Sequence, residues 1–440
     1  MLPAPCAAAP KGAFRLAAGL PAGETLLSID SDVAVLGAGI VGVSTALHLQ
    51  ARGRSVVLVD RRGPGEEASY GNAGLIERSS VVPYAFPRHA ATILRIALNR
   101  SSDVHFHWGF LPRMAPWLFG YWRHSGPRRL AAAARDMLPL IERSVSEHLP
   151  LLREAGASHL AREGGWLELC LGRRDLAASA RQAARLKPYG LDHEVLESHR
   201  LRALEPSLGP GIAGAVHWRD PVTVSSPGAV TKAYAELFLR RGGRFVRADA
   251  RALKQADAGW RLPGGDGEIR AREVVVALGA WSPDLLGPLG YRLPLAVKRG
   301  YHMHFRPAGN AALGRPVVHG HAGFVLSPML DGIRLTTGVE LAPRDAAPSP
   351  VQVDRAEAIA RTLFPLGERV EETPWMGVRP CLPDMKPVIG PGGRHAGLWF
   401  NFGHAHHGFT LGPASGRLLA ELMTAQAPFT DAAPYRADRF

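Results

Sequence analysis

Cysteine is scarce in this chain, and long apolar runs are missing from it. The 440 residues include 3 cysteines, and Cys6, Cys170 and Cys381 lie far apart without a C-x-x-C pair. This spacing indicates neither a disulfide framework nor a zinc site, and it fits a reducing compartment. No uninterrupted apolar run approaches the roughly 18 residues of a membrane-spanning helix, so no such helix is expected.

Blocks of basic residues are also lacking, although the formal net charge is +13 at pH 7. The charge comes almost wholly from scattered arginines, whereas nucleic-acid binding needs a clustered basic face, so we expect no nucleic-acid partner. The hydrophobic fraction of 46% and the charged fraction of 21% are ordinary for a globular protein of two or three domains. The first thirty residues are rich in Ala, Pro and Gly and lack an export signal, which predicts a loose N-terminal extension over residues 1–30.

A nucleotide-binding pattern follows in the stretch VAVLGAGIVGVSTALHLQARGRSVVLVD. Apolar runs at 33–36 and 55–59 predict two buried strands, and Gly37, Gly39 and Gly42 have G-x-G-x-x-G spacing before the helix between them. Such glycines permit a tight turn and a close approach to a pyrophosphate, which the helix N-terminus attracts. Asp60 ends the second strand, where a carboxylate can bond ribose hydroxyls and repel a 2′-phosphate. This pattern leaves NAD and FAD both open.

Later segments predict the rest of a nucleotide domain. The loop EEASYGNAG over 66–74 is rich in small residues and suits a segment that wraps a ligand. A serine at 225 or 226 can cap a helix that runs to about 241, and strands are expected at 245–246 and 274–277. Near the end, a strand at 398–402 leads through a loop rich in Gly and His to a helix over about 412–423.

A second domain is expected to begin near Pro83. Alternating Ala, Leu, Arg and Glu between 130 and 186 predict helices that break near Gly164 and Gly165. The segments PLAVKRGYHMHF and GIRLTTGVE alternate as antiparallel strands do, which predicts a sheet that covers a substrate pocket.

Four ordered motifs carry a family resemblance: the glycine pattern with Asp60, then ASYGNAG, VVVALGAWS, and GVRPCLPDMKPVIGP followed by GHAHHGFTLGPASG. Together they resemble the FAD-dependent D-amino acid oxidase superfamily over nearly the whole sequence, most of all those of its D-amino acid dehydrogenases that consist of one polypeptide. The resemblance implies FAD rather than NAD. It does not imply covalent attachment, because related sarcosine-type oxidases carry their attachment cysteine farther from the Pro-Asp of this motif than Cys381 lies from Asp384.

The resemblance also implies an α/β fold, in which a discontinuous Rossmann-like FAD-binding domain joins an α+β substrate domain built on an antiparallel sheet. The expected FAD-binding domain covers 31–82, 206–288 and 372–440, and the expected substrate domain covers 83–205 and 289–371. The helix after Gly412 would support the pyrimidine end of the flavin.

Site residues are expected from the pattern and the resemblance together. Arg379 holds the position of the family's carboxylate-binding arginine, whose planar charged fork suits a carboxylate. Tyr301 and His302 are expected to line the pocket, and His404, His406 or His407 to tune the flavin or contact substrate, with sheet packing and a structural loop as the alternatives. The expected catalytic residues are Arg379, Tyr301, His302 and His407. The expected cofactor-binding residues are Gly37, Gly39, Ile40, Val41, Gly42, Asp60, Arg61, Ser69, Asn72, Ala73, Gly74, Ala277, Gly279, Ala280, Trp281, Gly403, His404, Gly408 and Thr410; no metal is expected.

The function implied is FAD-dependent oxidation of a D-amino acid, with cyclic ones such as D-proline among the candidates. Hydride transfer from Cα to flavin N5 would give an imine or a 2-oxo acid. Oxygen and a respiratory quinone both stay open as electron acceptors, and so does the oligomeric state. The alternatives are a glycine- or sarcosine-type secondary-amine oxidase, a non-catalytic flavin-binding accessory protein and the flavin module of an RNA-modifying enzyme.

The aromatic and basic segment from His105 to Arg129 lacks clean alternation. Packing between helices is the first interpretation, and a lid over the active site or contact with a membrane interface are the others. We accordingly expect a cytoplasmic protein with peripheral membrane contact left open.

Overall fold

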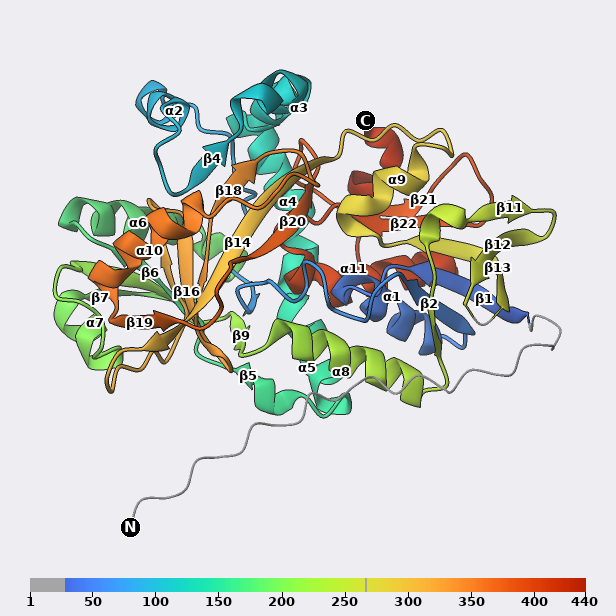
Figure 1. Cartoon of the computed structure of the whole chain (residues 1–440), viewed down its shortest axis with the longest axis horizontal. Helices are drawn as coiled ribbons and strands as arrows, with labels where there is room; N and C mark the ends of the chain where they lie inside the picture. The colour runs from blue at the N-terminus through green and yellow to red at the C-terminus, as the bar shows by residue number, and fades with distance from the viewer. Residues whose placement is uncertain (1–27, 266) are drawn as a thin grey trace, which may run out of the picture.

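The computed structural model describes residues 28–265 and 267–440, and it contains two large sheets that lie at opposite ends of the molecule (Figure 1). Nearly all of the predicted N-terminal extension, with Cys6, lies outside the described residues. The first strand, β1, already begins at Ile29, which is 9% exposed, so the last residues assigned to the extension belong to the sheet.

The sheet on the right of Figure 1 has eight strands and carries the predicted nucleotide-binding pattern. Its parallel centre runs in the order β10, β2, β1, β13 and β22, and antiparallel β12, β11 and β21 extend it. The strands are β1 Ile29–Leu36, β2 Val56–Asp60, β10 Arg244–Arg247, β11 Lys254–Ala256, β12 Gly259–Gly264, β13 Gly267–Val276, β21 Val388–Pro391 and β22 Leu398–Phe402. The predicted Rossmann-like order of strand, helix and strand is confirmed.

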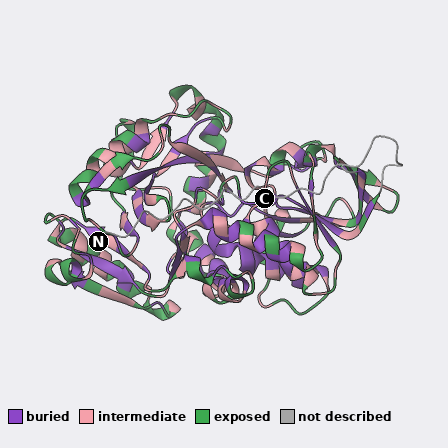
Figure 2. Ribbon diagram, turned by 60° about the horizontal axis from the view of Figure 1, so that its bottom comes forward, coloured by how far each residue is buried: buried purple, intermediate pink, exposed green. Residues whose placement is uncertain are grey.

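Helices α1 (Ile40–Gln50), α8 (Pro227–Arg240) and α11 (Gly408–Met423) pack together with the parallel strands in one apolar core. Figure 2 shows buried residues concentrated in the sheets and in the central helices. Ser226 caps α8 as predicted, because its side chain accepts a hydrogen bond from Ala229 N at 3.4 Å. Helix α11 begins at Gly408 rather than near 412, so it is about one turn longer at its start than predicted.

The second large sheet has eleven strands, of which nine run in the order β4-β18-β14-β17-β16-β15-β6-β8-β7, while β19 and β20 also pair with β14. Most pairs are antiparallel, as predicted, but β4 with β18 and β6 with β15 are parallel. The strands are β4 Val104–Phe106, β6 Trp166–Cys170, β7 His193–Glu197, β8 Gly214–Trp218, β14 Ala296–Pro307, β15 Val317–His319, β16 Phe324–Met329, β17 Gly332–Thr336, β18 Val339–Leu341, β19 Leu366–Arg369 and β20 Trp375–Cys381.

The pairing of two strands differs from the predicted domain limits. Strands β8 and β20 fall within the segments 206–288 and 372–440, yet both pair in the eleven-stranded sheet. Between the large sheets, β9 (Val222–Val224) joins β3 (Leu75–Ile76) and β5 (Ala161–Arg162) in a small third sheet. The chain therefore returns to the nucleotide-binding part only after β8 and only after β20. Both returns come later in the sequence than the limits at 206 and 372 that the local pattern predicts.

The remaining helices lie mainly in the inserted segments. They are α2 Ala90–Ala97, α3 Leu111–His124, α4 Pro127–Glu142, α5 Ser144–Glu154, α6 Arg173–Arg185, α7 Ser198–Leu204, α9 Ser282–Leu286 and α10 Val351–Leu363. The predicted helices between 130 and 186 are present, although strand β6 interrupts them after Gly165. None of the helices in the described part of the protein combines the length and the hydropathy needed to cross a bilayer.

The contact between α1 and α11 generates the first prediction. A Cβ atom on Gly416 would lie 2.8 Å from Thr45 N on the facing helix, so no side chain fits there. We expect Gly416→Val to lower the free energy of unfolding by about 1–3 kcal/mol, because overpacking displaces the two helices. Urea unfolding followed by circular dichroism measures this, and Ala177→Val on the exposed side of α6 is the matched control. Equal unfolding midpoints for both variants would contradict the close contact.

Candidate functional site

A cavity of about 890 Å³ extends from the N-terminus of α1 to the face of β14, within the range of small-molecule sites. Most predicted cofactor residues line it: Gly37, Gly39, Ile40, Val41, Asp60, Arg61, Ser69, Asn72, Ala73, Ala277, Gly279, Ala280, Trp281, Gly403, His404, Gly408 and Thr410. Gly42 and Gly74 do not contribute to its wall. A Cβ on Gly42 would overlap Gly37 O, and one on Gly74 would overlap Val224 O, so both glycines serve close backbone packing.

The glycine turn between β1 and α1 brings backbone to the cavity. Gly37 has a φ of +110°, and a Cβ there would overlap Ala277 O at the end of β13. Asp60 Oδ2 accepts a hydrogen bond from Ala38 N at 2.7 Å, which fixes the carboxylate beside the turn. Ser69 Oγ accepts from Ile40 N at 3.0 Å. The turn, the acid and the amides at the start of α1 thus converge as in a dinucleotide site.

The loop over 66–74 is held by an arginine that the sequence pattern did not reveal. Arg334 on β17 is 2% exposed, and its Nη1 donates to Tyr70 O at 2.9 Å and to Asn72 O at 2.6 Å. Its Nε lies 2.9 Å from His304 Nε2. This arginine therefore fixes the position of the loop against the sheet. Its only sequence signal is a charged residue inside the alternating strand GIRLTTGVE.

Arg379 lies on β20 and faces the cavity, directly opposite Lys298 on β14. Its Nη1 donates to Gly338 O at 2.6 Å, and its Nη2 donates to Thr337 O at 3.1 Å. The guanidinium covers Gly300, where any side chain would collide with it. Among the described residues Arg379 has no ion-pair partner, and burial lowers the pKa of its guanidinium. Lys298, Tyr84 and His406 also line the cavity, and of these only His406 was singled out from the sequence.

Tyr301 and His302 differ from their predicted roles. Tyr301 contributes to the cavity wall, but its hydroxyl donates to Glu340 Oε2 at 2.5 Å and accepts from Arg299 Nη2 at 2.6 Å, so it is already occupied. His302 lies outside the cavity wall, because its ring stacks on Trp375 with centroids 4.8 Å apart. Burial lowers the pKa of His302 to about 2, and the ring is a neutral part of the packing.

The three histidines of the loop after β22 do reach the cavity. His404 Nε2 lies 3.0 Å from Ser415 Oγ, and the rings of His406 and His407 are 3.9 Å apart. Burial lowers the pKa of His404 to about 3, of His407 to about 4, and that of His406 well below its usual value. These rings are therefore neutral near pH 7 and offer hydrogen bonds rather than charge.

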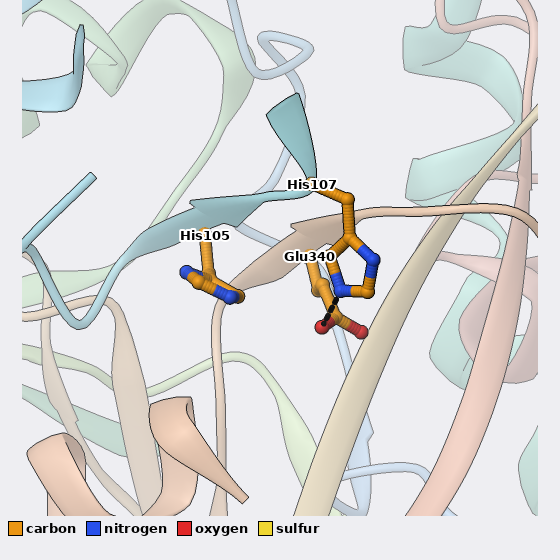
Figure 3. A group of neighbouring side chains, drawn as sticks. All are labelled: His105, His107 and Glu340. Atoms are coloured by element: carbon orange, nitrogen blue, oxygen red, sulfur yellow. Dashed lines mark hydrogen bonds and ion pairs between the residues drawn. The ribbon is translucent and has the colours of Figure 1, made fainter. Parts of the chain in front are cut away.

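His105, His107 and Glu340 bring three atoms of metal-ligating type within 4.8 Å of one another (Figure 3). Glu340 is fully buried and forms an ion pair with Arg299, whose Nε lies 2.9 Å from Oε2, and His107 Nε2 lies 3.1 Å from Oε1. Because Arg299 already balances the carboxylate, we interpret the group as a partly buried polar network beside the paired strands β4 and β18.

The aromatic segment from His105 to Arg129 divides into two sets of rings. Trp117 and Tyr121 of α3 are 7% and 8% exposed and line the cavity, so they pack as first expected. Trp108, Phe119 and Trp122 are instead 65%, 62% and 43% exposed, so they are not packed between helices, and Trp108 also borders the cavity.

These features fit FAD, because the glycine turn, Asp60 and the N-termini of α1 and α11, whose N-cap residues make no side-chain capping hydrogen bond, all border one cavity. Residues 32–422 match the family described as DAO, FAD dependent oxidoreductase. The chain is 32% identical to the D-amino-acid oxidase of Bradyrhizobium diazoefficiens, over 93% of this chain and 98% of that protein. It is 31% identical to the D-amino acid dehydrogenase of Rhizorhabdus wittichii, over 93% of this chain and all of that protein.

Solved structures share the fold at lower identity. Glycine oxidase from Geobacillus kaustophilus superposes with a TM-score of 0.71 at 22% identity, covering 93% of this chain and 99% of that one. L-proline dehydrogenase from P. horikoshii superposes with a TM-score of 0.70 at 19% identity, covering 94% and 98%.

The buried loop histidines generate a prediction about pH. The unfolded protein takes up a proton on histidine near pH 6.5, whereas folded His404 stays neutral down to about pH 3, so its contribution to stability is complete above pH 7 and is lost as the pH falls from 6.5. Between pH 7.5 and pH 5, one such histidine lowers the free energy of unfolding by about 2 kcal/mol. We expect His404→Asn to reduce the difference in urea midpoint between these pH values, and exposed His89→Asn to leave it unchanged. An unaltered pH dependence in His404→Asn would contradict the buried neutral ring.

Proposed function

Because the chain belongs to the FAD-dependent oxidoreductase family, we propose that it oxidises a D-amino acid at Cα. The observation that carries the proposal is Arg379, a half-buried arginine that faces the cavity and has no ion-pair partner among the described residues. FAD, when bound, would supply the acceptor for the Cα hydrogen as a hydride; the substrate amine would lose a proton to solvent, so that the C–N bond becomes C=N. Water then adds to the C=N bond and releases ammonia and a 2-oxo acid.

The role of Arg379 is to bind the substrate carboxylate and thereby to orient Cα. Two of its N–H groups already donate to Gly338 O and Thr337 O, which hold the guanidinium in one plane over Gly300. A planar, permanently charged group held in this way suits a carboxylate. Fixing one end of a small substrate orients its Cα–H bond, and such orientation can supply much of the rate acceleration of an enzymatic reaction.

The neutral loop histidines support a cavity that accepts the substrate amine without repelling it. His407 Nε2 and His406 Nε2 are buried and have no hydrogen-bond partner among the described residues. Each is available to a bound ligand. An obligatory protein base is not needed, because the amine proton leaves to water.

The D-amino acid proposal is tested by anaerobic reduction of the bound flavin, followed at its visible absorption band. We expect D-amino acids to bleach the flavin and their L-enantiomers to leave it oxidised, with D-proline, glycine and sarcosine in the panel to test the secondary-amine alternative. Readmitting air distinguishes an oxidase, which reoxidises quickly, from a dehydrogenase, which needs a quinone. A bound flavin that no amino acid reduces would leave the accessory-protein interpretation.

A quinone acceptor would require contact with a membrane, and exposed Trp108, Phe119 and Trp122 support that proposal. Co-sedimentation of the flavin-loaded protein with anionic vesicles tests this membrane contact. Absence of binding at low salt would contradict the contact.

The role of Arg379 gives a separate prediction. Arg379→Leu is expected to raise the substrate KM about a hundredfold while the flavin stays bound, because a charge-assisted bidentate contact is lost. Steady-state kinetics with an artificial acceptor measures this, and Arg261→Leu at an exposed position of β12 is the control. An unchanged KM would remove Arg379 from the substrate site.

A further inference from the structure

Two cations, buried Lys298 and half-buried Arg379, face the cavity from adjacent strands. Lys298 on β14 is paired in register with Arg379 on β20, and Lys298 is 8% exposed. Side chains directly opposite on antiparallel strands have Cβ atoms about 4.5–5.5 Å apart, and like charges at such positions are destabilising. The protein therefore carries an unfavourable pair of charges at the wall of its own site.

No carboxylate in the described part of the protein forms an ion pair with either cation. The carboxylates that line the cavity bind other groups: Asp60 binds Ala38 N, Glu67 binds Arg61, Glu77 binds Ser79, Asp103 binds Arg95, Asp249 binds Arg251, and Asp284 binds Arg344. A buried charge normally has a partner, because removing it from water is costly. The carboxylate of a bound ligand would supply the missing negative charge.

The ammonium of Lys298 is held in place by aromatic rings. Its Nζ lies 4.1 Å from the centroid of the Tyr121 ring and 5.0 Å from that of Trp117. Cation–π contacts of this kind stabilise a desolvated ammonium but leave its N–H groups without acceptors. No hydrogen bond from Nζ to another group is present among residues 28–265 and 267–440. The rings orient the lysine, and its donors remain available to the cavity.

We infer that Lys298 and Arg379 together recognise an amino acid with a second carboxylate, of the size of aspartate or glutamate. Arg379 binds the main-chain carboxylate and Lys298 binds the side-chain carboxylate. The separation of two opposite side chains on adjacent strands suits the two carboxylates of one small molecule. This inference rests on the proposed function, and it names the substrate class for the same site.

The test compares matched pairs of substrates that differ only in charge, D-glutamate against D-glutamine and D-aspartate against D-asparagine. The natural holoenzyme is expected to have a higher kcat/KM for the acidic member of a pair. Lys298→Met keeps an unbranched side chain over the rings and is expected to reduce that preference about tenfold to a hundredfold. Lys298→Arg, which keeps the charge, is expected to retain most of it, and exposed Lys254→Met serves as the control.

A binding measurement makes the result independent of turnover. Glutarate and butyrate each offer one carboxylate to Arg379 and cannot be oxidised as amino acids, so calorimetry on the holoenzyme reports the second carboxylate alone. Tighter binding of glutarate, lost in Lys298→Met, supports the inference. Equal binding of the two acids, or a substrate preference that Lys298→Met leaves unchanged, overturns it. If neutral D-amino acids reduce the flavin and acidic ones do not, only this inference fails; if none does, the proposed function fails and the glutarate measurement still decides the role of Lys298.

Discussion

The parallel pairing of β1 with β13 is the constraint on which the rest of the molecule depends. Residues Ile29–Leu36 are in register with residues 269–276, although the whole of 37–266 lies between the two strands. Within that interval, strands β2, β10, β11 and β12 join the same sheet, whereas the segment that carries β3 to β9 lies outside it and forms an insertion. The same pairing brings Ala277 against Gly37, so that two distant segments border the cavity together.

Strand β14 divides the positive charges of the second part of the molecule into two environments. On one face, Arg299 is fully buried and forms an ion pair with equally buried Glu340 at 2.9 Å. On the other face, Lys298 and the guanidinium of Arg379 border the cavity without such a partner among the described residues. Neighbouring positions of one strand thus carry a charge neutralised within the protein and a charge available to a ligand. Alternation along the strand produces this difference, because successive side chains point to opposite faces.

Local patterns predicted β1, α1, β2, α8 and β22, because each has its own signals of apolar runs, glycines or caps. The pairing of β8 and β20 in the larger sheet could not be predicted, since register between distant strands leaves no mark in a local pattern. Lys298 was missed for the same reason, because its relevance to the site follows only from its position opposite Arg379.

The prediction for His302 was wrong because a residue next to a pocket residue in the sequence can still point elsewhere. Here the His302 ring stacks on Trp375. Gly408 was assigned to a loop, yet it begins α11, where the absence of a side chain leaves the first turn open to the cavity.

The long interval between β1 and β13 also has a consequence for synthesis of the protein. At translation rates of about 5–20 residues per second, on the order of ten to fifty seconds pass between the emergence of the first strand and that of the partner on its other side. During this time β1 and β2 present an apolar edge with unpaired backbone groups, the kind of surface that associates with other polypeptides. The architecture that places two distant segments at one site therefore makes the nascent protein dependent on protection of its N-terminal strands until β13 has been made.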